Sequence, residues 1–375
     1  LKDYKKALID FAKVLEISPK DHKAFFYRGL AEFELGNYQV AIDNFYKTIE
    51  LNPQHFNSYY YIAKARKELA DLPEAIKMLD AAIELNPEFT KAYNSRAAIK
   101  IELRDFEGAE GDYSKVIELF PKDAASYVER GNVRRILFDY EGAKEDYTTA
   151  VKLNPELTDT QYNLGLLEYE FKNFDTALDC MNRTLEAETT NHEAFNSRGL
   201  VKYALKNYNA AIVDYSKALE LCPENSVYYL NRGDSKAALE DNYGAIADYT
   251  KALINPNFAK AYENRGYIKQ RLGDYFGAVA DFSKSINLEP NIAIKYFNRA
   301  CAQKELENNN EAIDDLGKAI NLNPKFAKAY FMRGLIYYSV RSYRNAHNDW
   351  EKAKSIDPDI NPQLDQLLKD VRNRI

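Results

Sequence analysis

The sequence predicts an all-α solenoid, in which short helix pairs repeat every 34 residues along the chain. The first observation behind this prediction is the spacing of proline, which is 34 residues except for one step of 33 and one place where Thr189 stands instead. A fixed period of about 20 to 50 residues is typical of repeat architectures. The prolines in this series are Pro19, Pro53, Pro87, Pro121, Pro155, Pro223, Pro256, Pro290, Pro324 and Pro358.

The second observation is the recurrence of small residues at two positions of the period. With Pro53 as position 32, ten full repeats begin at residues 22, 56, 90, 124, 158, 192, 226, 259, 293 and 327. Position 20 is alanine in every repeat, and position 8 is glycine in seven repeats and alanine in the other three. A larger side chain at either position would push two helices apart, so we expect close helix contact there.

This pattern resembles the tetratricopeptide repeat, which has an aromatic residue at position 4, glycine at 8, alanine at 20, an aromatic residue at 24 and proline at 32. Position 4 departs from the pattern only at Gln161. The resemblance implies helix A near positions 1 to 14, helix B near positions 18 to 31, and a right-handed superhelix. In repeat six it places helix A at about 192–205.

Three segments follow from this numbering. Residues 1–21 are expected to form the second helix of a truncated repeat, with Tyr4, Ala7 and Phe11 at positions 17, 20 and 24. Residues 22–360 hold the ten tandem repeats, and 361–375 hold a capping helix after Pro362. The expected N-terminal segment implies further repeats upstream.

Arginine recurs at position 7 in eight repeats, and aspartate at position 23 in seven. Repeats two and five lack both residues, which indicates that the two are partners. Pairing within one repeat leaves the fewest mismatches, so we expect ion pairs between helices A and B; a basic ladder that binds an acidic partner is the alternative. The pairs taken as representative are Arg198 with Asp214, Arg232 with Asp248, and Arg265 with Asp281.

The resemblance implies that helix A positions 2, 5, 6, 9 and 12 line a concave groove. These positions vary along the chain and are rich in aromatic residues, which favours recognition of a protein partner. The alternative is that some of these side chains pack between repeats. The apolar and aromatic candidates are Tyr162, Leu166, Tyr169, Leu200, Tyr203, Phe297, Phe331 and Tyr338.

Position 6 carries asparagine in four repeats, at Asn163, Asn231, Asn264 and Asn298. A carboxamide both donates and accepts hydrogen bonds, so a row of them can pair with successive peptide groups of an extended chain. The row is similar to the asparagine ladder in the repeats of O-GlcNAc transferase; a solvated polar rim is the alternative. Because position 5 never holds lysine, recognition of an acidic chaperone C-terminus is not expected.

The rest of the sequence argues against other classes of function. The net charge of −6 disfavours nucleic-acid binding, and no apolar run is long enough for membrane insertion. The four histidines and three cysteines have no metal-site spacing, and no phosphate-binding loop or nucleophile motif is present, so no cofactor, metal, catalytic residue or small-molecule substrate is expected.

The sequence therefore predicts a non-catalytic scaffold that binds a peptide or helical segment of a protein in its groove. The alternative is a regulatory or substrate-selecting arm of a larger protein or enzyme whose catalytic domain lies elsewhere. The compartment stays open, with the cytoplasm favoured.

Overall fold

The computed structural model describes residues 3–375, which form 22 α-helices and no strand. The chain divides into two compact units, one ending at Ala187 and the other spanning Glu188–Ile375. In each unit, every helix A packs most extensively against the helix B that follows it, and each helix B also contacts the next helix A of its unit. The predicted all-α solenoid of helix pairs is confirmed.

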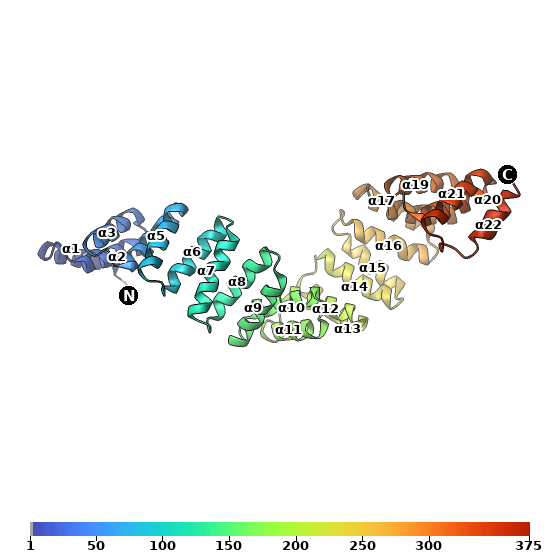
Figure 1. Cartoon of the computed structure of the whole chain (residues 1–375). Coiled ribbons are helices and arrows are strands. Elements are labelled where there is room, and N and C mark those ends of the chain that lie inside the picture. The colour runs from blue at the N-terminus through green and yellow to red at the C-terminus, as the bar shows by residue number, and fades with distance from the viewer. Residues whose placement is uncertain (1–2) are drawn as a thin grey trace. The chain divides into compact units, whose positions relative to one another are not determined.

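The first unit contains eleven of the described helices, shown in blue to green in Figure 1. They are α1 (Tyr4–Ile17), α2 (His22–Glu34), α3 (Tyr38–Leu51), α4 (Phe56–Glu68), α5 (Leu72–Leu85), α6 (Thr90–Glu102), α7 (Phe106–Leu119), α8 (Ala124–Ile136), α9 (Tyr140–Leu153), α10 (Thr158–Glu170) and α11 (Phe174–Ala187).

The second unit contains the other eleven described helices, and its last helix is α22. They are α12 (His192–Ala204), α13 (Tyr208–Leu221), α14 (Ser226–Ala238), α15 (Asn242–Ala252), α16 (Ala259–Arg271), α17 (Tyr275–Leu288), α18 (Ala293–Glu305), α19 (Asn309–Leu322), α20 (Ala327–Ser339), α21 (Tyr343–Ile356) and α22 (Leu364–Arg372).

Small residues bring the two helices of each pair together. All ten alanines at position 20 are completely buried. At Gly199, position 8 of repeat six, an added Cβ would lie 2.6 Å from a ring carbon of Tyr215, at position 24. The Tyr215 ring of helix B therefore lies directly on the backbone of helix A, which explains why position 8 holds only glycine or alanine.

Each A–B turn contains one residue in the left-handed region, always at position 15. Gly36 and Gly273 fill this position in two repeats, with φ of 80° and 82°, whereas the other eight repeats use non-glycine residues with φ near 60°. Helix B then begins after an N-cap at position 16. Aspartate at this cap, as at Asp105 and Asp274, accepts a hydrogen bond from the backbone amide three residues later.

The structure differs from the regular pattern in repeat seven. Helix α15 ends at Ala252, three positions before the usual end of helix B. This repeat is one residue shorter than the others, and the chain leaves the helix early in a turn that leads to Pro256. The missing residue is thus absorbed at the end of helix B, and the next helix A keeps its place.

The terminal helices both pack against their neighbours. Helix α1 packs against α2, and α22 packs against α21 through Leu364, Leu368 and Val371, which surround the buried Trp350. None of the helices in residues 3–375 is long and apolar enough to cross a membrane.

The contact at position 20 can be tested with leucine. In repeat four, Ala143→Leu should lower the free energy of unfolding by about 1–3 kcal/mol, because Ala143 is fully buried between helices and the added carbons must displace them. Urea unfolding followed by circular dichroism measures the change. Ala125→Leu in the same repeat is the control, since Ala125 is exposed; equal effects of both substitutions would contradict this account.

Candidate functional site

A depression of about 460 Å³ lies on the second unit, across four successive repeats. Its lining includes Tyr203 from α12, Asp234 from α14, Asn264 and Tyr267 from α16, and Asn298 from α18. Helix A of each of these repeats contacts helix A of the next, so side chains at equivalent positions come together. Three of the predicted residues, Tyr203, Asn264 and Asn298, therefore share one concave surface, called here the unit-2 groove.

Asp234 is the most desolvated acid of the groove. Its Oδ1 accepts hydrogen bonds from the Tyr249 hydroxyl at 2.7 Å and from Asn264 Nδ2 at 2.8 Å. Burial raises the pKa of Asp234, and its two hydrogen bonds and the charge of Lys260 only partly oppose this rise. Burial, and the charge of Asp234 next to it, also raise the pKa of Tyr249.

The charged residues at the rim of the groove have partners of their own. Lys260 Nζ lies 3.4 Å from Glu263 Oε2 within α16. Arg271 Nη2 donates to Asn242 Oδ1 at 2.5 Å. Neither cation forms an ion pair or hydrogen bond with Asp234, so Asp234 is the groove carboxylate without a cationic partner among the described residues.

The four asparagines at position 6 differ in their bonding. Asn231 Nδ2 donates to Asn196 Oδ1 at 2.8 Å, and Asn264 Nδ2 donates to Asp234. The side chains of Asn298 and Asn163 form no hydrogen bond with the described residues. Asn298 therefore has both its donor and its acceptor available inside the groove. Asn231 and Asn264 use their Nδ2 donors within the protein, and their side-chain carbonyl oxygens remain available as acceptors.

Several of the predicted aromatic residues pack inside their own repeat. Tyr169 contacts Phe174 with ring centroids 5.9 Å apart, and Tyr203 contacts Tyr208 at 5.3 Å. These are positions 12 and 17, on either side of the A–B turn. Tyr203 nevertheless keeps 37% of its surface exposed, so one side of it packs the turn while the other is open.

In repeats nine and ten the predicted residues take part in packing. The Phe297 ring lies 5.1 Å from that of Phe326. Phe331 packs on the cluster formed by Trp350 and α22, and the Tyr338 hydroxyl donates to Asp370 on α22. The structure thus places Phe331 and Tyr338 in the contact with the last helix, and we leave them out of the proposed binding surface.

The other predicted residues lie outside the unit-2 groove. Tyr162, Asn163 and Leu166 belong to α10 of the first unit and are half-buried. Leu200, on α12, is half-buried and does not line the groove. Of the predicted positions, the unit-2 groove therefore collects Tyr203, Asn264 and Asn298.

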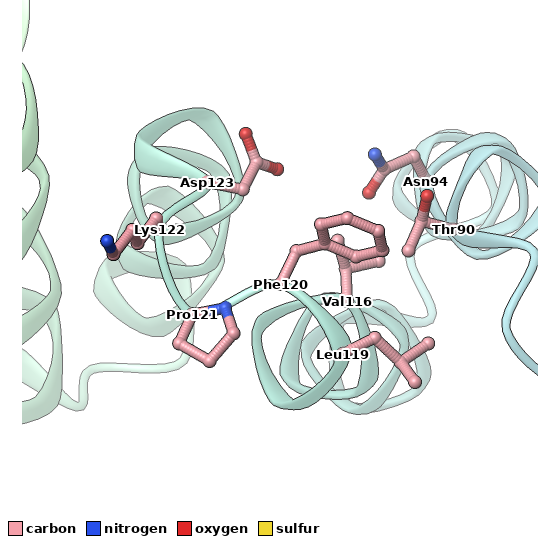
Figure 2. Close-up of a pocket in the computed structure, with 8 residues that line it drawn as sticks. All are labelled: Thr90, Asn94, Val116, Leu119, Phe120, Pro121, Lys122 and Asp123. Carbon is pink, nitrogen blue, oxygen red and sulfur yellow. The ribbon is translucent and has the colours of Figure 1, made fainter.

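The first unit has its own depressions. One of about 500 Å³ is lined by α6, α7 and α8, with Asn94, Glu102 and Glu129 among its residues. Another, of about 680 Å³, surrounds Phe120, whose side chain is 57% exposed. Figure 2 shows that Thr90 and Asn94 reach it from α6, while Lys122 and Asp123 come from the loop before α8. This second depression is mainly apolar and has no buried charge.

The arginine at position 7 forms a paired network away from the groove. In repeat six Arg198 Nη2 lies 2.7 Å from Asp214 Oδ1, and its Nε donates to Oδ2 at 2.9 Å. The aspartate is almost fully buried, and the same two-bond geometry joins Arg232 to Asp248 and Arg265 to Asp281.

Three further partners of this network are absent from the sequence-based prediction. Lysine at position 11 also reaches the aspartate, as Lys236 reaches Asp248 at 2.7 Å. The remaining Arg232 nitrogen donates to Ser216, at position 25 of the preceding repeat, so the arginine also links neighbouring repeats. Finally, the guanidinium lies over the ring at position 4, at 5.6 Å for Tyr229.

Repeat one shows what happens when the aspartate is missing. Arg28 Nε donates to the neutral Asn44 Oδ1 at 2.5 Å. Burial lowers the pKa of Arg28, and the charge of Glu32 only partly opposes the effect. Arg299, which faces an aspartate, shows the opposite: hydrogen bonding to Asp315 raises its pKa in spite of its burial.

No group of three or more histidine, cysteine, aspartate and glutamate side chains within residues 3–375 is arranged to hold a metal ion. The three cysteines are unpaired thiols, and burial raises the pKa of Cys180 and of Cys301 to about 11. Both side chains are thus neutral thiols near pH 7, the less reactive form of cysteine.

Comparison with known proteins identifies the family. Tetratricopeptide repeat models match residues 1–56, 60–124, 124–157, 192–225, 259–292 and 327–360, and a TPR repeat model matches residues 302–340. Together these matches span more than half of the sequence, and the chain belongs to the tetratricopeptide repeat family. The search of curated proteins found no match.

Solved structures with the same repeat resemble parts of the chain. The C-terminal part of a TPR repeat-containing protein from Cytophaga hutchinsonii is 24% identical, with a TM-score of 0.52, over 62% of this chain and 95% of that chain. A tetratricopeptide repeat protein from Parabacteroides merdae is 23% identical, with a TM-score of 0.49, over 67% and 99%. YrrB, described as a TPR protein with an unusual peptide-binding site, is 21% identical, with a TM-score of 0.46, over 49% and 95%.

A double-mutant cycle tests the energy of the paired network. Asp248→Met alone should cost about 3–5 kcal/mol of unfolding free energy, because it leaves the buried Arg232 unpaired. Adding Arg232→Ile, which reproduces the isoleucine and methionine of repeat two, should recover most of that loss. Urea unfolding measures all four proteins. The exposed pair Lys217 and Glu220 is the control, with an expected coupling below about 1 kcal/mol; a coupling no larger at Arg232 and Asp248 would refute the account.

The pH dependence of stability offers a separate test. Burial alone would raise the pKa of Asp248, but hydrogen bonds from Arg232 and Lys236 outweigh it and lower the pKa below its ordinary value of 3.8. A depressed folded-state pKa stabilises the protein above the unfolded-state pKa, and this stabilisation is lost as the pH falls through the folded-state value. Asp248→Asn should therefore differ from wild type at neutral pH, and the difference should shrink below about pH 4. Urea unfolding across this range measures it, and a difference independent of pH would contradict the prediction.

Proposed function

We propose that the protein is a non-catalytic scaffold that binds an extended peptide segment of a protein partner in the unit-2 groove. One observation carries the proposal: the open depression of about 460 Å³ brings together aromatic side chains, an asparagine with free hydrogen-bonding groups and a carboxylate. Such surfaces combine contact area from the rings with a few placed polar groups that fix the ligand.

The organisation of the repeats supports this choice of surface. Positions 8 and 20 hold only glycine or alanine and position 24 holds only large apolar or aromatic residues, whereas the groove positions change from repeat to repeat. At position 5, repeat eight has Glu263 where repeat nine has Phe297. At position 9, two repeats have Asp234 and Tyr267 where others have Leu200 and Cys301. Because helix packing does not restrict the residues at the groove positions, those residues can differ between repeats and make the surface specific for one ligand.

An extended peptide suits the polar groups of the groove. An extended strand exposes peptide N–H and C=O groups at regular intervals. The Asn298 amide can bond both kinds of group, and the carbonyl oxygen of Asn264 can accept from an N–H group. The net charge of −6 adds no support for a nucleic acid ligand, and the proposal includes no membrane, cofactor or small-molecule substrate.

The proposed organisation of the chain is that derived from its repeat numbering: a second helix in residues 1–21, ten repeats in 22–360 and a cap in 361–375. The helix pairs from α2 and α3 to α20 and α21 support it, as does the packing of α22 on Trp350.

Selection from a displayed library of random linear peptides tests the function. The wild-type chain should enrich peptides of related sequence, and a double variant, Asn298→Ala with Tyr267→Ser, should bind the best synthetic peptide at least tenfold more weakly, because it removes a hydrogen-bonding group and a ring from the lining. Fluorescence anisotropy measures the Kd.

The matched control is Tyr243→Ser, which removes a ring that is 78% exposed and does not line the groove. It should leave the Kd unchanged. Failure to enrich any peptide, or equal losses in both variants, would reject the unit-2 groove as a peptide site.

A further inference from the structure

We infer that Asp234 binds the side chain of a lysine or arginine in the peptide that occupies the unit-2 groove. The inference rests on the proposed function and adds the chemical class of residue that the ligand must carry. It follows from three observations. These are the geometry of the Asp234 carboxylate, the presence of a neutral asparagine at the same position in repeat four, and the hydrogen-bond and ion-pair partners of the nearby cations.

The carboxylate presents one oxygen to the groove. Both of its hydrogen bonds, from Tyr249 and Asn264, go to Oδ1. Oδ2 accepts no hydrogen bond from the described residues. It is also not one of the solvent-inaccessible side-chain atoms that lack a hydrogen-bond partner, so Oδ2 is accessible to solvent. Asp234 thus has a fixed orientation and a second oxygen that a ligand can reach.

The scaffold itself does not require a charge at this place. In repeat four, Asn132 occupies position 9, as Asp234 does in repeat seven. The Tyr147 hydroxyl donates to Asn132 Oδ1 at 2.7 Å, the same bond at the same length as that from Tyr249 to Asp234. A neutral carboxamide therefore satisfies the tyrosine as well as a carboxylate does.

The charge of Asp234 is also costly. Burial disfavours the ionised form of a carboxylate unless hydrogen bonds or a cation compensate it, and here burial is the largest influence on the pKa and raises it. The nearby Lys260 and Arg271 bond to Glu263 and Asn242 instead. A cation supplied by the ligand would remove this cost, whereas an anionic ligand side chain would add to it.

The lining around the carboxylate fits a long cationic side chain. Tyr203 and Tyr267 line the same depression, and their rings can pack against the methylene stem of lysine or stack with a guanidinium. Asn298 lies in the lining on the repeat after that of Tyr267. Its amide N–H and C=O groups are free and can bond the peptide backbone. An acidic or small apolar side chain would leave Oδ2 without a partner.

The experiment uses peptides from the random library and two isosteric changes. The selected peptides should be enriched in lysine or arginine at one position. Replacing that arginine by citrulline, or that lysine by acetyl-lysine, removes the charge of the ligand. Asp234→Asn removes the charge of the protein while keeping an oxygen for Tyr249 and Asn264, as Asn132 does for Tyr147.

Each change alone should weaken binding about tenfold to a hundredfold, and the two together should be no worse than either, because both remove the same ion pair. Asp314→Asn, which makes the same change of net charge at an exposed site on α19, should leave the Kd unchanged. Urea unfolding of Asp234→Asn should match or exceed the wild-type stability, because the buried charge is gone.

The outcomes separate the two claims. Peptides without a preferred basic residue, or equal Kd values for wild type and Asp234→Asn, would overturn the role of Asp234 while leaving peptide binding in the groove intact, as judged by the loss in the Asn298→Ala, Tyr267→Ser variant. Failure to select any peptide would overturn both the groove function and the inference that rests on it.

Discussion

The contact between the backbone of helix A and the ring of helix B is the constraint on which the rest of the structure depends. At Gly199 there is no room for a Cβ beside Tyr215, and the opposing Ala211 is fully buried. This contact fixes the rotation of helix A about its axis. Where successive repeats of one unit share this rotation, positions 5, 6, 9 and 12 of their helices face the same side, and a groove is a consequence of the scaffold.

Much of the fold was therefore predictable from the sequence. The invariant alanine and the proline period fix the number of helix pairs, and the structure ends α12 at Ala204, one residue from the expected boundary. The absence of arginine and aspartate from the same two repeats led from Arg198 to Asp214, the two residues that form a bidentate pair in the structure. These features repeat, and a feature that occurs many times in one chain can be recognised without any structure.

Features that depend on local geometry were not predictable in the same way. The left-handed residue at position 15 is glycine in only two repeats, and side chains as different as Phe138 and Lys206 adopt the same φ in others. Each such non-glycine residue costs about 1–2 kcal/mol relative to a relaxed backbone, so the packing of the two helices must impose the turn. The residue type at position 15 therefore does not indicate its left-handed conformation, because the packing of the flanking helices imposes it.

The groove shows the same limit for function. The rule that selects groove positions also selects Asp234 and Tyr267, but neither is among the residues predicted from the sequence. Those residues are aromatic residues, leucines and asparagines, because a single acid on a helix is most often solvated. Only the structure shows that Asp234 is half-buried beside Tyr249 and that no cation of the described residues pairs with it.

The chain thus uses acidic residues in two distinct environments. Aspartates at position 23 are nearly inaccessible, and each pairs with the arginine at position 7 of its repeat. Five of the seven also pair with a lysine or arginine at position 11, as Asp248 and Asp146 do. These carboxylates are buried and already paired, so a ligand cannot bind to them. Asp234 is half-buried and forms no ion pair with the described residues. Asp234 is the groove carboxylate without a cation among the described residues, and it is best explained by a partner that brings the missing charge.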